Sequence, residues 1–575
     1  MNKIKYFAIA SLLLCGCDDF LKDEPYGPST SEDFWKTETD VKSALNAFID
    51  YNVNEGVYGR GVYWFENCSD DMFTGRPQGP SDAYTCERFQ MGANNNLDAN
   101  ATWPAMYQMI AKANNVFRYV PGMSISDEVK SNAIGQAHFY RAFAYLWLCP
   151  WYGDNGPING GIPIVTEDTP LDDMDQPRPE SVLANYDMII NDMEEAAKRL
   201  PLLSQLSADD YGRPYKTAAW AFAARAALYA AQYDAENTGN PYYTKVIALC
   251  DSIMNLTGAD YRELHTRAST ADTSLGLKPS NFSDLFRWEN NFSSEYIFSL
   301  LGNEKRGPKF HGMFFSAGGF SWYNTWGYFM PTLELYNAFE PNDTRRDATI
   351  LSPGQHIQFI GHDVHWCLNP TQMYSESGMT NRKFMSIFEA EDCVGKYVNV
   401  SGNNQSNRLA VSLMRYADIL LMKAEALIWT QGEGNAEAKR LIDLVRVRAG
   451  LAPNSTATKD ELKKERRLEF AFEFFPSRHL DLVRWKDAQK TYAKPTTGWK
   501  VETKDDLTRP IWEDEAKTTQ KKDALGNLLY EKMLAGLTVN TVRAPREFDP
   551  DIHHVFPIPA GEVNRSKNLR QNKGY

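Results

Sequence analysis

Two glutamates four residues apart have the clearest spacing in this chain for acid–base chemistry. Glu465 and Glu469 fall on one face of an expected helix, and such a carboxylate pair can act as general acid and general base. Arg466 stands beside them, and Asp481 and Arg484 follow closely. The same five residues could instead form an ion-paired network between helices. We favour the network and expect these residues to belong to the scaffold.

A second group of residues has the types that bind metal ions. The run from His362 to Cys367 contains two histidines, an aspartate and a cysteine, but it has no helical setting and no partner cluster. Aspartates that could bind calcium lack an EF-hand pattern; they are Asp172, Asp173, Asp343 and Asp347. We therefore expect no metal ion and no other cofactor.

Composition excludes one class of partner. The chain has 575 residues, a formal charge of −13 and 43% hydrophobic residues. It has no basic stripe of the kind that binds phosphate backbones, which excludes a nucleic-acid partner. Its hydrophobic content is enough for a large core, and its length suits several domains or one helical repeat array.

Six cysteines after residue 17 are scattered along the chain, at positions 68, 86, 149, 250, 367 and 393. They show no Cys-x-x-Cys spacing, so neither a zinc ribbon nor a dense disulfide framework is expected. Cys149 lies in an apolar helical run and is expected to be a buried free thiol. Cys68 and Cys86 could close a loop disulfide or remain free.

The first residues have the pattern of a secretory signal. Two lysines precede an apolar run from Tyr6 to Leu14, and the segment ends in Leu14-Cys15-Gly16-Cys17. A membrane-spanning helix needs roughly twenty apolar residues, which this run does not reach. The ending resembles the lipobox of bacterial lipoproteins. We expect residues 1–16 to be removed, Cys17 to be acylated, and residues 17–29 to form a tether; an ordinary signal cleavage is disfavoured because no Ala-x-Ala site is present.

Residues 30–257 are expected to form an N-terminal helical part that carries one long loop at 54–100. Apolar residues recur with helical spacing in several stretches, at about 30–52, 103–117, 126–149, 179–199, 216–235 and 242–256. Trp103 and Tyr107 lie on an apolar helix face and are expected in the core. The motif Arg-Ala-x-x-Tyr occurs at 141–145 and again at 225–229, which indicates tetratricopeptide-like helix pairs.

The helical pattern stops at residue 258 and returns near residue 406. Residues 258–405 are rich in Gly, Asn and aromatic residues, and we expect a loop-rich inserted subdomain with minor β structure. Residues 406–575 form a C-terminal helical part and closing segment, with helices at about 412–429, 435–449 and 458–474. Thr458 and Glu461 form a capping box at the last of these, and Gly450 ends the middle one. The predicted fold class is mainly α.

Several segments, taken in order, resemble the SusD/RagB family of surface nutrient-binding lipoproteins. They are Cys17-Asp18-Asp19-Phe20-Leu21, Trp103-x3-Tyr107-x2-Ile110-x2-Ala113-Asn114, Arg141 to Tyr145 running on to Tyr152-Gly153-Asp154, Arg415 to Ala426, Glu465 to Phe470, Leu480 to Trp485, Phe556-Pro557-Ile558-Pro559, and Gln571-Asn572-x-Gly574-Tyr575. One departure is a longer corner at residues 473–479, which touches scaffold residues only.

The resemblance implies a binding protein without catalytic activity. Such a protein is lipid-anchored in the outer membrane, faces the cell exterior, and delivers a glycan to a SusC-like TonB-dependent transporter. A sugar ring presents an apolar C–H face to an aromatic ring, while amide, guanidinium and carboxylate groups bind its hydroxyls. Aromatic residues make up 13% of this chain, more than a helical core of this kind needs. Some of them are therefore expected in loops.

Two irregular regions, 54–100 and 288–329, contain rings and polar groups of the types that bind sugars. We favour Trp322, Tyr323 and Trp326, because Gly318 and Gly319 precede them and make a buried regular element improbable. The full set of candidate ligand-binding residues is Trp322, Tyr323, Trp326, Trp288, Tyr296, Arg76, Tyr84, Asn94, Asn96 and Asp98.

Three other readings remain open at the level of sequence. The same scaffold could capture peptides or glycoproteins, since rings and amides serve either ligand. A glycoside hydrolase would need two carboxylates roughly 5–10 Å apart in a cleft, and no motif marks such a pair. A purely structural subunit beside the transporter would bind no soluble ligand.

Overall fold

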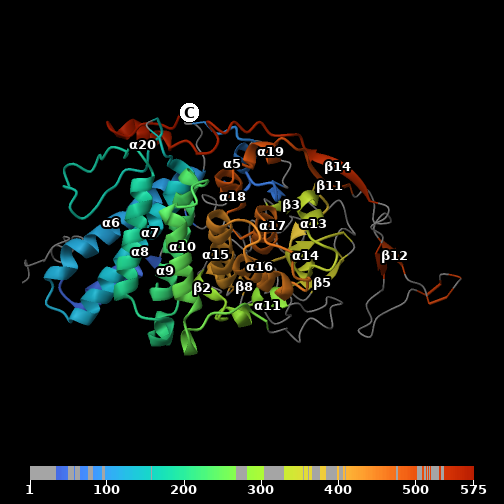
Figure 1. The fold of residues 1–575 in the computed structure, drawn as a ribbon, viewed down its shortest axis with the longest axis horizontal. Helices are drawn as coiled ribbons and strands as arrows, with labels where there is room; N and C mark the ends of the chain where they lie inside the picture. The colour runs from blue at the N-terminus through green and yellow to red at the C-terminus, as the bar shows by residue number, and fades with distance from the viewer. Residues whose placement is uncertain are drawn as a thin grey trace, which may run out of the picture.

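The protein, described here from a computed structural model, consists mainly of α-helices packed side by side (Figure 1). The structure describes residues 34–49, 57, 65–74, 82–92, 98–156, 158–266, 281–302, 329–353, 355–359, 362–365, 376–383, 398–399, 406–407, 409–473, 477–500, 508–510, 513–514, 516, 518–519, 530–532 and 537–575. The α-helices of the first half are α2 (Glu38–Asn46), α5 (Asp82–Glu87), α6 (Thr102–Tyr119), α7 (Asp127–Tyr152), α8 (Leu183–Arg199), α9 (Lys216–Ala231) and α10 (Pro241–Met254). Those that follow are α11 (Asn281–Leu285), α13 (Leu333–Ala338), α14 (Thr344–Thr349), α15 (Tyr416–Gln431), α16 (Ala436–Arg448), α17 (Lys459–Phe470), α18 (Arg478–Arg484), α19 (Ala488–Tyr492) and α20 (Ala560–Arg565).

The long helices form one continuous array. From α6 to α10 each helix packs against the next, and α10 then packs against α15 although residues 255–415 separate them in the sequence. α15 in turn contacts α16 and α17 (Figure 1). Stacked helix pairs of this kind confirm the mainly α, tetratricopeptide-like fold predicted from the sequence.

The described strands are short and pair two by two. The pairs are β1 (Met72–Phe73) with β3 (Met330–Pro331), β2 (Tyr296–Leu300) with β10 (Val411–Arg415), β4 (Ile350–Leu351) with β7 (Thr380–Asn381), β5 (His356–Phe359) with β6 (His362–His365), β8 (Val398–Asn399) with β9 (Ser406–Asn407), β11 (Thr496–Lys500) with β14 (Thr538–Arg543), and β12 (Thr508–Pro510) with β13 (Tyr530–Lys532). All pairs are antiparallel.

Several helix boundaries differ from the sequence prediction, and two of these differences have a clear structural reason. The helix predicted from residue 412 begins at Tyr416, because residues 411–415 pair with β2 as strand β10. The helix predicted to end before Pro150 continues to Tyr152. Pro150 lies in its last turn, where a missing N–H removes only one hydrogen bond. The predicted ends of two other helices are confirmed, since Thr458 Oγ1 accepts from the Glu461 N–H and Gly450 follows α16 at φ +83°.

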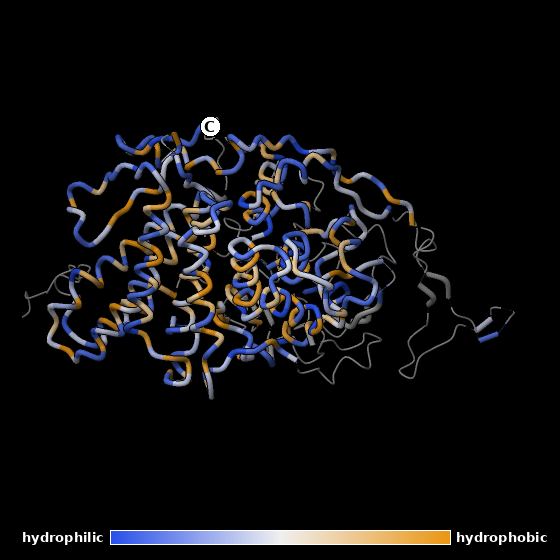
Figure 2. Tube along the Cα trace, in the orientation of Figure 1, coloured by the Kyte–Doolittle hydropathy of each residue, from blue (hydrophilic) through white to orange (hydrophobic). Residues whose placement is uncertain are grey.

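Helix α7 is buried along most of its length and forms the centre of the first half. Its small residues allow neighbours to approach closely, and a Cβ on Gly135 would lie only 2.9 Å from the Cβ of Arg199 in α8. Trp103 is buried, as predicted, and the partly buried Tyr107 packs against the core and donates to the Pro163 carbonyl at 2.8 Å. Figure 2 shows that hydrophobic residues run along the packed helices of the array.

The two Arg-Ala-x-x-Tyr motifs have the same structural role. Arg141 on α7 binds Asp192 on α8 through its Nε and Nη2 atoms, at 2.7 and 2.9 Å. Arg225 on α9 binds Asp418 on α15 and donates to the Leu413 carbonyl at 2.9 Å. In each motif the arginine guanidinium therefore joins its own helix to a carboxylate on a neighbouring helix, α7 to α8 and α9 to α15.

Glu465 and Glu469 lie in a buried ionic network, but their partners are not those predicted. Arg345 Nη1 lies 2.6 Å from Glu465 Oε1 and 3.3 Å from Glu469 Oε2. Arg415 Nη1 lies 2.9 Å from Glu469 Oε1, and Arg448 binds the same oxygen. Burial alone would raise the pKa of Glu469, but these arginines hold it well below its usual range. The scaffold interpretation of this pair therefore fits the structure.

Arg466, Asp481 and Arg484 form a second, separate network. Arg466 Nη1 lies 2.8 Å from Asp418 Oδ1, and Arg466 Nε lies 3.1 Å from Asp481 Oδ2. Arg484 bridges Asp481 and Glu425, with Nη2 at 2.8 Å from Glu425 Oε2. This network joins α15, α17 and α18 to α9 through Asp418.

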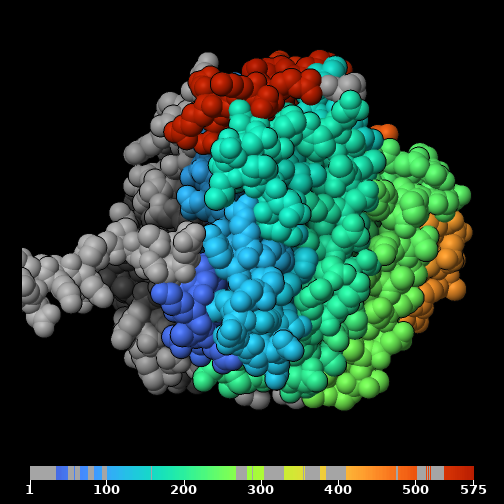
Figure 3. Space-filling model, turned by 90° about the vertical axis from the view of Figure 1, so that its left-hand side faces the viewer, coloured from blue at the N-terminus to red at the C-terminus, as the bar shows by residue number. Residues whose placement is uncertain are grey.

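The C-terminal residues lie across one end of the helical array (Figures 1 and 3). Asn572 donates to the carbonyls of Tyr152 and Phe556, at 3.0 and 2.8 Å. Arg178 Nη1 donates to Asn572 Oδ1 at 2.7 Å. The closing segment is therefore held to the first half of the chain by buried hydrogen bonds.

Replacing Asp418 by Asn should destabilise the fold strongly. Asn has a similar volume but no charge, and Arg225 and Arg466 would lose their shared carboxylate. We expect the free energy of unfolding in urea to fall by about 3–5 kcal/mol. The exposed pair of Glu437 and Arg440 provides the control, because Glu437→Gln should cost at most about 1 kcal/mol. Equal losses for the two variants would contradict this role of Asp418.

Candidate functional site

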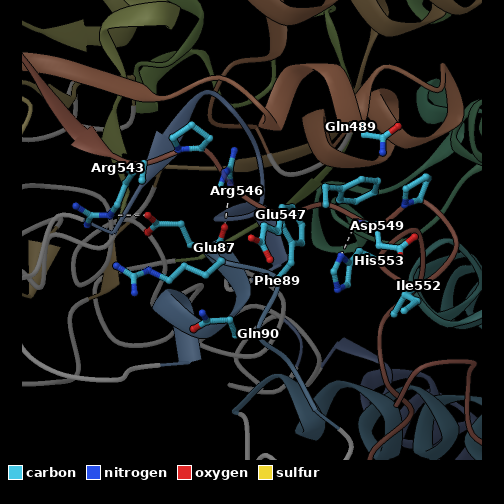
Figure 4. A pocket seen from close by; sticks show the side chains of 15 residues that line it. Glu87, Phe89, Gln90, Gln489, Arg543, Arg546, Glu547, Asp549, Ile552 and His553 are labelled. Carbon is cyan, nitrogen blue, oxygen red and sulfur yellow. Dashed lines mark hydrogen bonds and ion pairs between the residues drawn. The ribbon is translucent and has the colours of Figure 1, made fainter.

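A cavity of about 960 Å³ opens beside α5, the short helix that carries the predicted ligand residue Tyr84 (Figure 4). One wall comes from the end of α5, another from α19, and a third from the segment that follows β14. The lining residues are Glu87, Arg88, Phe89, Gln90, Gln489, Arg543, Ala544, Pro545, Arg546, Glu547, Phe548, Asp549, Pro550, Ile552 and His553.

Arg543 fixes the wall formed by the end of β14. Its Nε lies 2.6 Å from Glu87 Oε1, its Nη1 lies 2.6 Å from Glu376 Oε2, and its Nη2 donates to the Thr74 carbonyl at 2.7 Å. Burial raises the pKa of Glu87, although the Arg543 guanidinium acts in the opposite direction. Arg543 therefore joins α5, β14 and the segment after β1 into one rigid edge.

Arg546 and Phe89 form the base of the cavity. Arg546 donates to the carbonyls of Cys68, Ser69 and Glu87, at 2.8, 3.0 and 3.1 Å. Phe89 has φ +55°, a conformation that disfavours bulky side chains, and its buried ring stacks on His553 at 5.5 Å between centroids. Packing around the ring holds this strained residue in place.

The rim of the cavity carries hydrogen-bonding groups that face solvent. Arg88, Gln90, Gln489, Glu547 and Asp549 are all exposed. Together they present guanidinium, amide and carboxylate groups, which are the groups that bind hydroxyls. The rim can therefore bind a polyhydroxylated ligand.

Tyr84 lies at the edge of this region and is half-buried. Arg88 stacks on its ring at 3.7 Å from the centroid and also bonds to its hydroxyl. Arg543 stands 5.4 Å from the same ring. The two guanidinium groups fix the ring, so Tyr84 presents only part of its surface.

Tyr296 is not on a ligand-facing surface in this structure, which corrects the sequence prediction. It begins strand β2, its side chain is buried, and its hydroxyl donates to the Leu285 carbonyl at 2.7 Å. The pairing of β2 with β10 places the ring in the core. No local sequence signal distinguishes this buried ring from a loop ring.

Most other candidate residues lie outside the described part of the chain, namely Cys17, Arg76, Asn94, Asn96, Trp322, Tyr323 and Trp326. Trp288 begins the short helix η9 (Trp288–Asn290) and Asp98 begins η2 (Asp98–Ala101), while their side chains are outside the described set. Their roles stay predictions.

Some of the residues singled out for metal binding lie in the described part of the chain, while Cys367 lies outside it. His362–His365 forms strand β6, and Asp343 binds Arg345 at 2.8 Å. Within the described ranges, no three His, Cys, Asp or Glu side chains gather where they could hold a metal ion. In the same ranges, no helix combines the length and apolarity needed to cross a membrane.

The two cysteines near the cavity do not form a disulfide with each other. Cys68 and Cys86 are buried and unbridged, and Cys68 Sγ lies 3.0 Å from the Cys86 carbonyl oxygen. The loop disulfide left open by the sequence is therefore not formed. Cys149 is a buried free thiol, as predicted.

Arg543, Arg546, Gln489 and His553 line the cavity but were missed from the sequence. They belong to a part of the chain with little periodicity. The only local signal is the run of charged residues and prolines from Arg543 to Pro550. Their convergence with α5 depends on contacts between residues more than four hundred positions apart.

Comparison with known proteins places the chain among SusD-like proteins. Residues 290–575 match the SusD family, and residues 19–228 match a family described as starch-binding associating with outer membrane. SusD-like protein P2 of Formosa agariphila is 27% identical over 599 residues, covering 100% of both chains. A SusD-like protein of Bacteroides ovatus is 25% identical over 505 residues, covering 84% of this chain and 82% of the relative.

Solved structures show the same fold. A SusD-like protein of Bacteroides fragilis superposes with a TM-score of 0.72 at 22% identity, covering 96% of this chain and 100% of that one. Surface glycan-binding protein A of Bacteroides thetaiotaomicron, solved in complex with laminarihexaose, superposes with a TM-score of 0.66 at 17% identity, covering 93% and 99%.

Glu66, a buried carboxyl two residues before Cys68, should make stability depend on pH. Burial raises its pKa to about 8, and Asp71 and Asp481 add to the rise. The unfolded chain loses this proton near pH 4.5, so raising the pH from 4.5 to 8 favours unfolding. We expect Glu66→Gln to be more stable than the wild type at pH 8 by a few kcal/mol, on the order of the pKa gap.

Urea unfolding at several pH values checks this prediction. The advantage of Glu66→Gln should shrink as the pH falls towards 4.5, because the wild-type carboxyl is protonated in both states below that pH. The exposed Glu547→Gln serves as the control and should follow the wild type. An advantage that stays constant between pH 5 and 8 would rule out titration of Glu66.

Proposed function

Because this chain belongs to the SusD/RagB family, we propose that it captures a glycan at the cell surface. The observation that carries the proposal is the open cavity beside α5, whose exposed rim offers guanidinium, amide and carboxylate groups. Several proteins of the same fold support it by name. One is called a laminarin binding SusD-like protein, and another was solved with laminarihexaose.

The ligand-binding surface combines the cavity rim with aromatic rings from two loops. We propose Trp322, Tyr323, Trp326 and Trp288 as the rings on which sugars stack. Tyr84 joins the rim, and the polar candidates that bind hydroxyls are Arg76, Asn94, Asn96 and Asp98. Rings supply apolar contact area and the polar groups fix the orientation of the sugar.

The protein acts by binding and not by catalysis. Glu465 and Glu469, the carboxylates best spaced for acid–base work, are buried and paired with arginines. A glycosidase needs its two carboxylates in contact with the sugar in a cleft. These two have no access to a ligand in this structure.

The anchor and the transporter complete the proposal. Cys17 becomes lipid-modified after cleavage, and residues 17–29 tether the helical body to the outer membrane. More than one acyl chain is needed for stable anchoring. The captured glycan passes from the helical body to a SusC-like TonB-dependent transporter, and the match to a family described as associating with outer membrane supports this location.

Retardation in native gels tests glycan binding. The mature chain from Asp18 should be retarded by at least one soluble plant, microbial or host polysaccharide. Trp322→Ala with Trp326→Ala should lose most of this retardation, because each stacked ring accounts for more than about 1 kcal/mol of binding. If no polysaccharide retards the mature chain but deglycosylated protein binds to it, the ligand is a peptide and not a glycan.

Replacing Cys17 by Ser tests the anchor and the partner together. The tagged wild-type chain should incorporate labelled fatty acid, fractionate with the outer membrane and co-purify in detergent with a TonB-dependent transporter. Cys17→Ser should lose the label and leave the membrane fraction. Cys15→Ser is the matched control, since residue 15 lies in the removed segment. Labelling that persists in Cys17→Ser would contradict the lipobox assignment.

A further inference from the structure

Two large aromatic side chains from distant parts of the chain meet on the surface. Tyr211 is 42% exposed and Phe292 is 66% exposed. Their ring centroids are 5.6 Å apart and their planes are inclined by 46°. The two rings together form a small exposed aromatic surface.

The connection between α8 and α9 holds Tyr211 rigidly. Asp210, at the end of helix η5 (Ala208–Asp210), accepts hydrogen bonds from Ser207 Oγ at 2.8 Å and Arg213 Nε at 3.0 Å. Gly212 follows with φ +96°, and a Cβ there would lie 2.9 Å from Leu301 Cδ1. The turn that presents Tyr211 is therefore fixed by side-chain bonds and by close packing on the end of β2.

Side-chain contacts also hold the turn that carries Phe292. The next residue, Ser293, contacts His265 Nδ1 through its hydroxyl at 2.9 Å, and His265 Nε2 lies 3.0 Å from Asp284 Oδ2. Asn290 Nδ2 also donates to the Asp284 carbonyl at 2.7 Å. Both rings therefore stand on preorganised turns, and a ligand that stacks on them need not order the turns as well.

We propose that Tyr211 and Phe292 form an accessory carbohydrate platform that binds two neighbouring pyranose rings of a curved glycan chain. Two aromatic faces inclined to each other match successive sugars whose faces turn along the chain. A flat, ribbon-like chain would need two coplanar rings. This inference rests on the proposed glycan-binding function and names a class of ligand within it.

Exposed carboxylates close to the rings in sequence favour a glycan on this platform. Asp209 comes two residues before Tyr211 and Glu289 comes three residues before Phe292, and both side chains are exposed. Such carboxylates can accept hydrogen bonds from sugar hydroxyls.

The test compares polymers of different shape on the mature chain from Asp18. Laminarin and glycogen serve as curved probes, and konjac glucomannan serves as the flat probe. For a curved polymer that retards the wild type, Tyr211→Ala with Phe292→Ala should raise the Kd about tenfold. Tyr211→Phe should bind as the wild type does. Leu444→Ala with Val447→Ala is the matched control, because it removes two exposed aliphatic side chains, 41% and 55% exposed, from helix α16.

The outcomes separate this inference from the proposed function. One result would overturn the platform and leave glycan binding intact. In that result a polymer retards the wild type, Trp322→Ala/Trp326→Ala loses the retardation, and Tyr211→Ala/Phe292→Ala keeps it unchanged. A tenfold loss on glucomannan alone would overturn the curved-chain assignment. Failure of both curved probes to retard the wild type would overturn the platform. Circular dichroism and urea unfolding should match between the ring variant and the aliphatic control, which shows that a loss of binding is not a loss of folding.

Discussion

Charges in the interior of this protein have to be neutralised by other parts of the chain, because an unpaired buried charge costs several kcal/mol. Arg415, at the end of β10, is the centre of this compensation. It binds Glu295 before β2, Glu469 in α17 and Glu473 after it. Since those carboxylates lie in separate segments, the helices and the intervening strands can be buried together only in one arrangement.

The same compensation explains why charged residues reach the core at all. The pKa of Arg415 lies above its usual range, because the gain from three carboxylates exceeds the cost of burial. Lys383 lies beside Glu473 in the same network, and burial lowers its pKa to about 8. A rigid scaffold of this kind supports surface loops that can vary without disturbing the core.

Local periodicity predicted much of the scaffold and little of the candidate site. The apolar spacing of Trp103 and its neighbours predicted α6, because a helix face is a property of a few consecutive turns. The strand at residues 411–415 was not predictable in this way, since its pairing with β2 depends on a segment more than a hundred residues earlier. Tyr296 was assigned to a ligand surface for the same reason. The partners of Glu469 and the cavity residues Arg543 and Arg546 likewise depend on tertiary contacts that no local pattern encodes.

The bonds made by Asn572 have a consequence for the order of folding. Its amide satisfies the carbonyl of Tyr152 at the end of α7, and its oxygen accepts from Arg178. Arg178 also donates to the Tyr152 carbonyl at 3.0 Å, so the last turn of α7 acquires its second donor only when the final residues of the chain have been synthesised. Contacts over such sequence distances slow folding. Until then the first helices lack the hydrogen bonds that the closing segment makes at this end of the array.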